Sequence, residues 1–208
     1  MILLTVKAMG KTSIDKELLR LCAATEIVYS AVNLHDGIND SEEEGGAVLN
    51  GDTLHTLALL VASEIFPKNL LLDITKFIEK ISYMKISEEI RKPVYESGES
   101  YLESLKAWTS EYTSIFAFLC AYALKASVSE EALLEQCGYS LGILYRIITD
   151  HKSGKVAIEG FDPSISAREY AREAENAISG LKGSTYKKRL LKLIRLLYGN
   201  LQLNSRGR

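Results

Sequence analysis

The sequence predicts an all-α protein, and the main reason is the spacing of its apolar residues, which recur at helical intervals in several separate series. The first of these series contains Leu18, Leu19, Cys22, Val28 and Val32. No strand-like alternation of useful length occurs, and helix stop signals separate the series. We therefore expect about seven or eight helices with short connections. The length of 208 residues suits a single domain, residues 1–208, with one substantial core.

The later helices are predicted in chain order from further apolar series and their stop signals. These series contain Leu54, Leu57, Ala58 and Val61, then Ile74, Phe77, Ile78, Ile81 and Met84, then Leu105, Trp108, Tyr112, Ile115, Phe116 and Leu119. Interruptions are expected at Pro67, at Pro93 and Gly98, at Ser127 to Ser129 ahead of Glu130, and in the loop around Pro163. Ser166 with Glu169 predicts a capping box for the penultimate helix, and the last helix is predicted over residues 185–203.

Composition and charge are those of a soluble globular protein, with 47% hydrophobic residues and a mean hydropathy near zero. A net charge of −2 argues against a strongly electrostatic nucleic-acid binder. Cys22, Cys120 and Cys137 are an odd number in apolar stretches without metal-ligand spacing, which predicts reduced thiols and a cytoplasmic location. No apolar run approaches a membrane span, and the opening MILLTV is too short for a secretory signal.

Two carboxylates one helical turn apart, Asp36 and Asp40, stand at the end of the apolar segment LCAATEIVYSAVNLHDGIND. Positions i and i+4 share a helix face, so the two side chains are expected to project together. Mg²⁺ takes oxygen ligands and is commonly held by one or two carboxylates plus substrate phosphates. The pair therefore predicts half of a metal-diphosphate site, although helix-terminal aspartate pairs are also common as solvated ends.

Four further blocks give this pair a context. They read AVLNGDTLHTLALLVASE, YLESLKAWTSEYTSIFAFLCAYA, CGYSLGILYRIITD and, near the C-terminus, AREYAREAENAISGLKGSTYKKRLLKLIRLLYGNL. In order, spacing and residue types the blocks resemble the trans-isoprenyl diphosphate synthases, the polyprenyl synthetase family. The resemblance covers nearly the whole chain and implies an isoprenoid-synthase-like helical bundle. Because the chain opens on what looks like the helix after the family's Gly-Gly-Lys-Arg-x-Arg-Pro segment, the bundle is expected to lack the family's first helices.

The first motif departs from the family pattern at residues that would bind diphosphate. Where the family has Asp-Asp-x-x-Asp, this chain has Gly37 in the place of the middle carboxylate, between Asp36 and Asp40. The Arg-Arg-Gly segment that follows in the family is replaced by the acidic SEEEGG at residues 41–46. Negative charge at this place repels the anion that arginines would hold.

The second half of the family's site is reduced as well. At the family's Lys-Thr position stand Tyr112 and Thr113, and the Phe-Gln pair is replaced by Tyr145 and Arg146. Only Asp150 remains of the second aspartate-rich motif. Prenyl transfer needs metals and basic side chains that neutralise the leaving diphosphate, and losing one such donor alone costs roughly a hundredfold in rate. We therefore expect that the chain is not a complete catalyst by itself.

The resemblance also implies candidate site residues. Residual diphosphate or metal ligands are expected at Asp36, Asp40, Asp150 and Lys155, with Asp36 and Asp40 as the metal candidates. The chain-length tunnel is expected at Val28, Ala31 and Val32, the places that floor the channel for the growing prenyl chain in the family. Ordinary core packing explains the tunnel positions equally well, because both roles need apolar residues on that face.

Some members of the family are heterodimers whose small subunit is short of aspartate motifs. This chain is similar to that component I type of heptaprenyl and hexaprenyl diphosphate synthases. The resemblance implies an accessory subunit of a heterodimer or heterotetramer, which stabilises a catalytic large subunit and helps to set prenyl chain length, with Mg²⁺ bound in the complex. In isolation the chain is expected to be poorly soluble or to self-associate as a homodimer, because obligate interfaces are large and apolar.

Three other interpretations stay open. A reduced but active homodimeric Mg²⁺-dependent prenyltransferase needs Asp36, Asp40 and Asp150 to hold enough metal. A non-catalytic helical protein that binds a prenyl or other lipid needs only an apolar pocket. Contact with a membrane surface is also expected for the basic last helix, because its cations stand among leucines, although a helix packed on its own domain has the same pattern.

Overall fold

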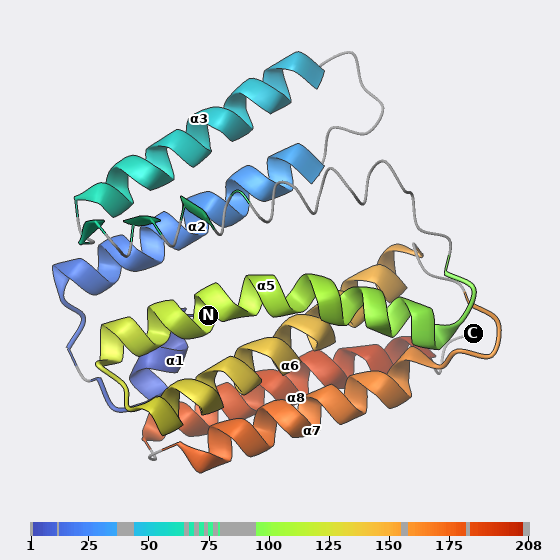
Figure 1. The fold of residues 1–208 in the computed structure, drawn as a ribbon. Helices are drawn as coiled ribbons and strands as arrows, with labels where there is room; N and C mark the ends of the chain where they lie inside the picture. The colour runs from blue at the N-terminus through green and yellow to red at the C-terminus, as the bar shows by residue number, and fades with distance from the viewer. Residues whose placement is uncertain are drawn as a thin grey trace. The chain divides into compact units, whose positions relative to one another are not determined.

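A computed structural model gives the fold of the chain (Figure 1). It describes residues 2–11, 13–36, 44–64, 67–68, 71–72, 75–76, 79, 95–154, 158–181 and 184–205. Among these, residues 2–4, 17, 29, 32–36, 44–48, 108, 110–116 and 200–205 are described by their backbone alone. The described residues form α-helices and the turns between them, with no strand, so the predicted all-α fold is confirmed.

The chain forms two compact units. Unit 1 consists of Met1–Thr12 and Glu79–Arg208, and unit 2 consists of Ser13–Ile78. Unit 1 contains α1 (Ile2–Ala8), α5 (Gly98–Leu124), α6 (Val128–Ser153), α7 (Pro163–Gly180) and α8 (Thr185–Ser205). Unit 2 contains α2 (Lys16–Asp36) and α3 (Glu44–Ser63). The single domain over residues 1–208 stays a prediction.

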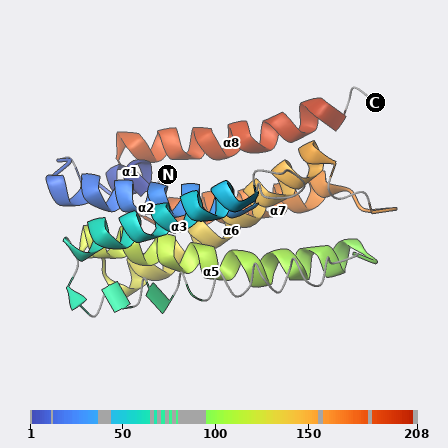
Figure 2. The same ribbon diagram turned by 90° about the horizontal axis from the view of Figure 1, so that it is seen from above.

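Helix α6 is the central helix of unit 1. It packs against α5 and α7, and α8 packs against α1, α6 and α7. Figure 2 shows α5 and α8 on opposite sides of the α6–α7 pair. The core of the unit includes Leu105, Leu141, Leu144, Ile178 and Leu190, which come from four different helices. Burial of one such side chain contributes roughly 1.5–3 kcal/mol, so these helices stabilise one another through a shared core.

Local sequence determines where α5 and α6 begin and where α5 ends. Ser97 caps α5, because its Oγ accepts a hydrogen bond from the Ser100 N–H at 3.2 Å and its own N–H donates to the Ser100 Oγ. The helix ends at Lys125, whose φ of 52° is left-handed. At the start of α6, the Glu130 carboxylate accepts a hydrogen bond from the Ser127 N–H at 3.0 Å. The predicted interruption ahead of Glu130 is therefore confirmed at Ser127, although Val128 and Ser129 already belong to α6.

Helix α7 begins one turn earlier than the sequence predicts. Its N-cap is Asp162, whose Oδ1 accepts a hydrogen bond from the Ser164 N–H at 2.8 Å, and Pro163 is the first helical residue. Hydrogen bonds from Ser164 lower the pKa of Asp162. Ser166 is buried inside the helix, so the predicted capping box of Ser166 and Glu169 is wrong. Asp162 is the N-cap instead of Ser166 because its carboxylate and the fixed φ of the following proline both favour a helix start.

Polar contacts hold α1 against parts of unit 1 that are distant in sequence. The Ser184 hydroxyl, just before α8, donates to the carbonyl oxygens of Lys7 and Ala8, at 3.0 and 2.7 Å. The Lys11 ammonium donates to the Ala123 carbonyl oxygen in the last turn of α5 at 3.2 Å. A cation is favoured there by the negative end of the helix dipole. The last helix itself is confirmed close to its predicted bounds.

Unit 2 is built mainly from α2 and α3, which pack along each other. The Asp15 carboxylate accepts a hydrogen bond from the Leu18 N–H at 2.8 Å and so caps the N-terminus of α2. An ion pair of 3.4 Å joins Arg20 to Glu64. Both side chains are exposed to solvent, so the pair contributes little to stability. Among the described residues of the two helices, the buried apolar side chains are Leu18, Leu21, Ala24, Ala31, Ala58 and Ala62.

The three cysteines are free thiols, with Cys120 and Cys137 buried and Cys22 half-buried. Burial raises the pKa of Cys137 to about 12. Because the thiolate is the reactive form, this thiol is a packing residue at neutral pH. In the part of the chain that the structure describes, every helix falls short of the length and apolarity needed to cross a membrane.

Candidate functional site

Asp150 lies in the last turn of α6 and is buried, with 6% of its surface exposed. The helix buries Leu144, Ile147 and Ile148 just before it. Asp150 follows Ile147 by three residues, so it continues this buried face. A carboxylate removed from water at such a place needs hydrogen-bond donors or a cation to offset the loss of hydration.

Two side chains act as these partners. Arg146, one turn earlier on α6, donates from its Nε to the Asp150 Oδ2 at 3.2 Å. The Tyr101 hydroxyl, from α5, donates to the same oxygen at 3.1 Å. Arg146 stands where the family that the sequence resembles has glutamine. This departure therefore places a cation beside the one aspartate that remains of the second motif.

Tyr101 is held on both sides by aromatic rings and is 1% exposed. Its ring makes edge-to-face contacts with Tyr95, at a centroid distance of 5.2 Å, and with Phe161, at 5.6 Å. Burial raises the pKa of Tyr101 well above its ordinary value, and the negative charge of Asp150 raises it further. The phenol therefore keeps its proton at neutral pH and remains a hydrogen-bond donor. We call Tyr101, Arg146, Asp150 and Phe161 the Asp150 cluster.

The Asp150 cluster suits an internal structural contact better than a metal site. Mg²⁺ prefers six oxygen donors in an octahedron, whereas Asp150 Oδ2 already accepts from a guanidinium and a phenol. The charge of Arg146 would also repel a metal ion bound to the same carboxylate. Among the residues that the structure describes, no group of three or more His, Cys, Asp or Glu side chains could hold a metal ion. The described side chains around Asp150 therefore do not form a suitable Mg²⁺ site.

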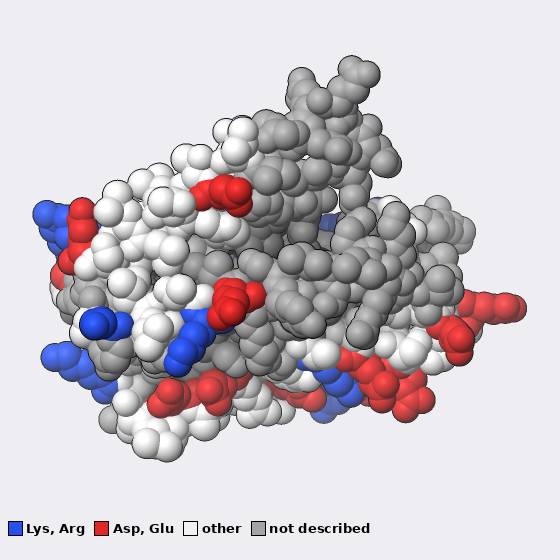
Figure 3. Space-filling model, turned by 45° about the horizontal axis from the view of Figure 1, so that its top comes forward, with Lys and Arg blue, Asp and Glu red and all other residues white. Residues whose placement is uncertain are grey.

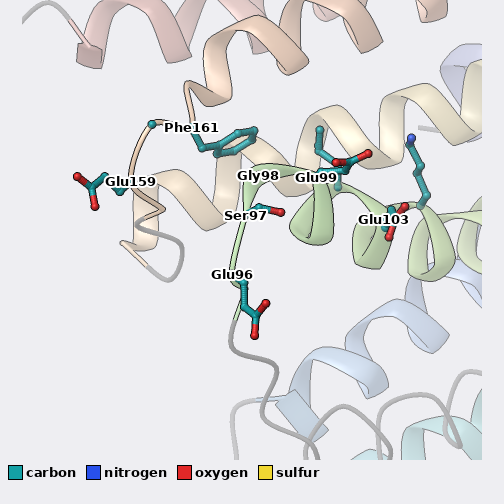
Figure 4. A pocket seen from close by; sticks show the side chains of 10 residues that line it. Glu96, Ser97, Gly98, Glu99, Glu103, Glu159 and Phe161 are labelled. Carbon is teal, nitrogen blue, oxygen red and sulfur yellow. The ribbon is translucent and has the colours of Figure 1, made fainter.

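A cavity of about 390 Å³ opens beside the start of α5. Figure 4 shows the side chains that line it, which come from the first turns of α5 and from the loop before α7. They are Glu96, Ser97, Gly98, Glu99, Leu102, Glu103, Lys106, Glu159, Gly160 and Phe161. The volume admits a small ligand, but four carboxylates against one ammonium repel an anion such as a diphosphate.

Gly98 lets the loop before α7 approach the start of α5. A Cβ atom at this position would overlap the ring of Phe161, and the close-up in Figure 4 shows the two residues together. Because no side chain stands at Gly98, the Phe161 ring reaches Tyr101 and completes the Asp150 cluster. A larger residue at position 98 would displace the ring and loosen the hold on Tyr101.

The predicted tunnel residues lie on α2. Ala31 is fully buried and Val28 is half-buried. Their three-residue spacing places them on the same side of the helix. Val32 is part of α2 by its backbone, but its side chain lies outside the described residues. The burial of Ala31 agrees with both a tunnel wall and ordinary core packing, since each needs an apolar residue there.

Three of the predicted diphosphate ligands are not described by their side chains. Asp36 is the last residue of α2, and only its backbone is described. Asp40 and Lys155 lie outside the described residues altogether. Asp150 is therefore the one predicted ligand with a described side chain.

Sequence reasoning missed Tyr101 and Arg146 as members of the site. Arg146 had a usable signal, because it precedes Asp150 by four residues and pairs of this spacing meet on a helix. Tyr101 had none, since it is 49 residues away and reaches Asp150 only because α5 packs against α6. The pairing of a motif residue with a distant partner therefore required the folded structure.

Comparison with solved structures decides the fold. The geranylgeranyl pyrophosphate synthetase from the archaeon Geoglobus acetivorans is 19% identical, with a TM-score of 0.75 and coverage of 95% of this chain and 83% of that chain. A geranyltranstransferase from Methanosarcina mazei is 16% identical, with a TM-score of 0.77 and coverage of 97% of this chain and 83% of that chain. A polyprenyl synthase from Caulobacter crescentus CB15, complexed with calcium and isoprenyl diphosphate, is 18% identical, with a TM-score of 0.77 and coverage of 95% of this chain and 81% of that chain. The chain has the isoprenoid-synthase fold.

No model of a protein family and no curated protein matches the chain. The isoprenoid-synthase fold confirms the predicted helical bundle, while the lack of the family's first helices stays a prediction. A fold hosts different activities, so function has to be argued from the site. In this chain the site residues that depart from the family pattern, above all Arg146, bear on function more directly than the bundle does.

Proposed function

We propose that the chain is an accessory subunit of a heteromeric trans-prenyl diphosphate synthase in isoprenoid biosynthesis. In this role it stabilises a catalytic large subunit, in a heterodimer or heterotetramer, and helps to set the length of the prenyl product. The class of protein is supported by the fold, because the similar solved structures include a geranylgeranyl pyrophosphate synthetase, a decaprenyl diphosphate synthase and a geranyltranstransferase. The accessory role is supported by the Asp150 cluster.

The hydrogen bonds of Asp150 are the observation that carries the proposal. Cleavage of an allylic diphosphate releases an anion whose charge has to be neutralised by metal ions and basic side chains held in place. In this chain Arg146 and Tyr101 both donate to Asp150 Oδ2. Freeing the carboxylate for a metal would break both contacts and leave Arg146 beside the metal ion. The complete metal-diphosphate site therefore belongs to the large subunit, together with its Mg²⁺.

Unit 2 offers an apolar surface for such a partner. Helix α3 exposes Leu49, Leu57 and Leu60, the last with 57% of its surface accessible. The residues between Asp52 and Glu64 carry no charge, and Figure 3 shows a mostly white, uncharged area over α3. Permanent interfaces are large and more apolar than the rest of a protein surface. We call Leu49, Leu57 and Leu60 the α3 leucine surface and assign it to the contact with the large subunit.

The proposal is tested by capture and reconstitution. A tagged form of the chain is purified from its source organism, and the protein that stays bound is identified and produced separately. The chain alone is then incubated with an allylic diphosphate, isopentenyl diphosphate and Mg²⁺. We expect no turnover by the chain alone, turnover by the mixture, and a product length that differs from that of the large subunit alone.

Asp150→Asn separates an accessory role from a catalytic one in the reconstituted complex. If Asp150 serves only the packing of α5 against α6, the folded complex keeps its turnover within about a factor of two, whereas loss of a catalytic ligand costs roughly a hundredfold or more. Turnover by the chain alone would replace the proposal by the homodimeric prenyltransferase. A tightly bound lipid with no protein partner would replace it by the lipid-binding interpretation.

A further inference from the structure

Helix α8 concentrates the positive charge of the chain. It carries five basic residues and no acidic one. These residues are Lys187, Lys188, Arg189, Lys192 and Arg195. Because the whole chain carries −2, the other residues together carry −7. One helix of an otherwise acidic chain is therefore strongly basic, which is an asymmetry typical of binding to an anionic surface.

The five cations differ in how far they are used inside unit 1. The Lys187 ammonium donates to the carbonyl oxygens of Ser179 and Leu181, at 2.8 and 2.7 Å, and so caps the end of α7. Arg195 donates from Nε to Glu175 Oε1 at 2.8 Å, but its side chain remains 70% exposed. Solvent screens such an exposed pair. Lys187 is therefore an internal contact, whereas Arg195 still contributes to the outer surface.

Lys188, Lys192 and Leu196 form a row along the outside of α8. They follow one another at four-residue intervals, so they share one face of the helix. All three are exposed, and Leu196 has 55% of its surface accessible. Arg189 flanks the row, with its guanidinium 5.1 Å from the centroid of the Tyr186 ring. We call the residues of this surface the α8 basic face: Lys188, Arg189, Lys192, Arg195 and Leu196.

The opposite face of α8 is already packed. Leu190 and Ile194 are fully buried, and the helix packs against α1, α6 and α7. Figure 2 shows α8 at one side of unit 1, away from α5. Leu190 and Ile194 could reach a bilayer only if the core opened. Among the described side chains of α8, the α8 basic face is therefore the surface open to contact in the folded protein.

We propose that the α8 basic face binds the surface of a membrane that contains anionic lipid. Its four cations complement negatively charged headgroups, and each such residue contributes about a fivefold gain in binding. Leu196 adds an apolar contact at the headgroup boundary, while the lysine stems extend beside it and keep their ammonium groups at the phosphates. A nucleic-acid backbone offers an exposed leucine no such contact. This inference goes beyond the accessory role and does not depend on it.

The test is sedimentation of the full chain with sucrose-loaded phosphatidylcholine vesicles, prepared with and without phosphatidylserine. We expect binding only to the vesicles that contain phosphatidylserine, and release at high salt, which screens the headgroups. Lys188→Gln combined with Lys192→Gln should lower the partition coefficient about 25-fold. Leu196→Ser should lower it about fivefold through the lost apolar contact.

Lys106→Gln combined with Lys152→Gln is the matched control, because it removes the same charge from exposed lysines of α5 and α6. This control should bind the vesicles as the original chain does, and circular dichroism should show the same helix content for both double variants. Equal binding to both kinds of vesicle, absence of vesicle binding, or an equal loss in the control would overturn the proposal. It would also be overturned if the chain retained a single-stranded oligonucleotide but no vesicle.

Discussion

Helix α8 of unit 1 and helix α3 of unit 2 differ in where they place two of their large apolar side chains. In unit 1, Leu190 and Ile194 of the outer helix α8 are fully buried, and the buried charge of Asp150 is matched by its two donors. In unit 2, Leu57 and Leu60 of α3 are exposed, while Ala58 and Ala62 of the same helix are buried. Among the described side chains, α8 therefore buries two large apolar residues in the core of unit 1, whereas α3 leaves two leucines exposed on unit 2.

This difference separates stability from association. Apolar surface removed from water contributes about 25 cal/mol per Å², and unit 1 gains this within the chain. Unit 2 gains this free energy for the α3 leucine surface only when another surface covers those leucines. We therefore expect substitutions in unit 1 to act on the folding of the chain, and substitutions on the α3 leucine surface to act on its binding to the large subunit.

The largest effect is expected from truncating a core leucine of α8. Leu190→Ala should lower the free energy of unfolding by about 2–5 kcal/mol, because it leaves a cavity in the core. Leu60→Ala, the same change on the exposed face of α3, should lower it by about 0.5 kcal/mol or less. Urea unfolding of the dilute chain measures both values. Equal losses would show that α3 is as much a part of the chain's own core as α8.

The next effect concerns association. Leu57→Glu combined with Leu60→Glu should weaken binding to the large subunit by at least about a hundredfold, because two leucine contacts are lost and two charges are placed at an apolar interface. Ile165→Glu is the matched control, since Ile165 is exposed on α7 of unit 1. Isothermal titration calorimetry measures the affinities. Similar losses in the two variants would remove α3 as the interface.

A smaller effect is expected at the Asp150 cluster and depends on pH. The folded state raises the pKa of Tyr101 above its ordinary value of 10.0, so the stability from the protonated phenol is fully present below pH 10.0 and declines as the pH rises above it. Tyr101→Phe should make the decline shallower by about 1.4 kcal/mol per pH unit, while Cys137 and Tyr170, whose pKa values burial also raises, still contribute. The substitution should also cost about 1–3 kcal/mol at neutral pH through the lost hydrogen bond.

Tyr122→Phe is the control for this pH dependence, because Tyr122 is an exposed tyrosine of the same helix α5. Denaturant unfolding at several values between neutral and alkaline pH should show the same decline for this variant as for the original chain. If Tyr101→Phe declines just as steeply, the buried phenol does not titrate as its surroundings require.

The smallest effect is expected on product length. If Ala31 borders the product channel, Ala31→Phe should shorten the product of the reconstituted complex, because a large ring would block the channel. The substitution also overpacks a fully buried position, at a cost of about 1–3 kcal/mol in stability. Chromatography of the products and thermal unfolding of the complex separate the two effects. If the folded complex makes a product of unchanged length, the large subunit alone sets the length of the prenyl product.

Much of the fold was predictable because the signals are local. Apolar spacing predicted the helices, the serines ahead of Glu130 predicted the start of α6, and the last helix lies close to its expected bounds. The start of α7 was missed because two candidate N-cap residues, Asp162 and Ser166, stand four residues apart. The N-cap of the helix is Asp162, which is followed by a proline.

The site was less predictable because its contacts join distant segments. Asp150 was predicted from its motif, yet its role follows from Tyr101, which belongs to another helix. In the same way, periodicity shows that both α3 and α8 have apolar residues, but not which residues another helix covers. Burial of Leu190 and exposure of Leu60 are properties of the packing, so they appear only in the folded chain.

The hydrogen bonds from Ser184 to α1 have a consequence for biosynthesis. Ser184 and Ala8 are separated by 176 positions along the chain, so the first helix leaves the ribosome long before its partner is made. At roughly 5–20 residues per second, the wait lasts roughly 10–35 seconds. During that time the buried face of α1, which includes Val6 and Ala8, lacks its cover from α8, and the nascent chain presents it to whatever chaperones attend its synthesis.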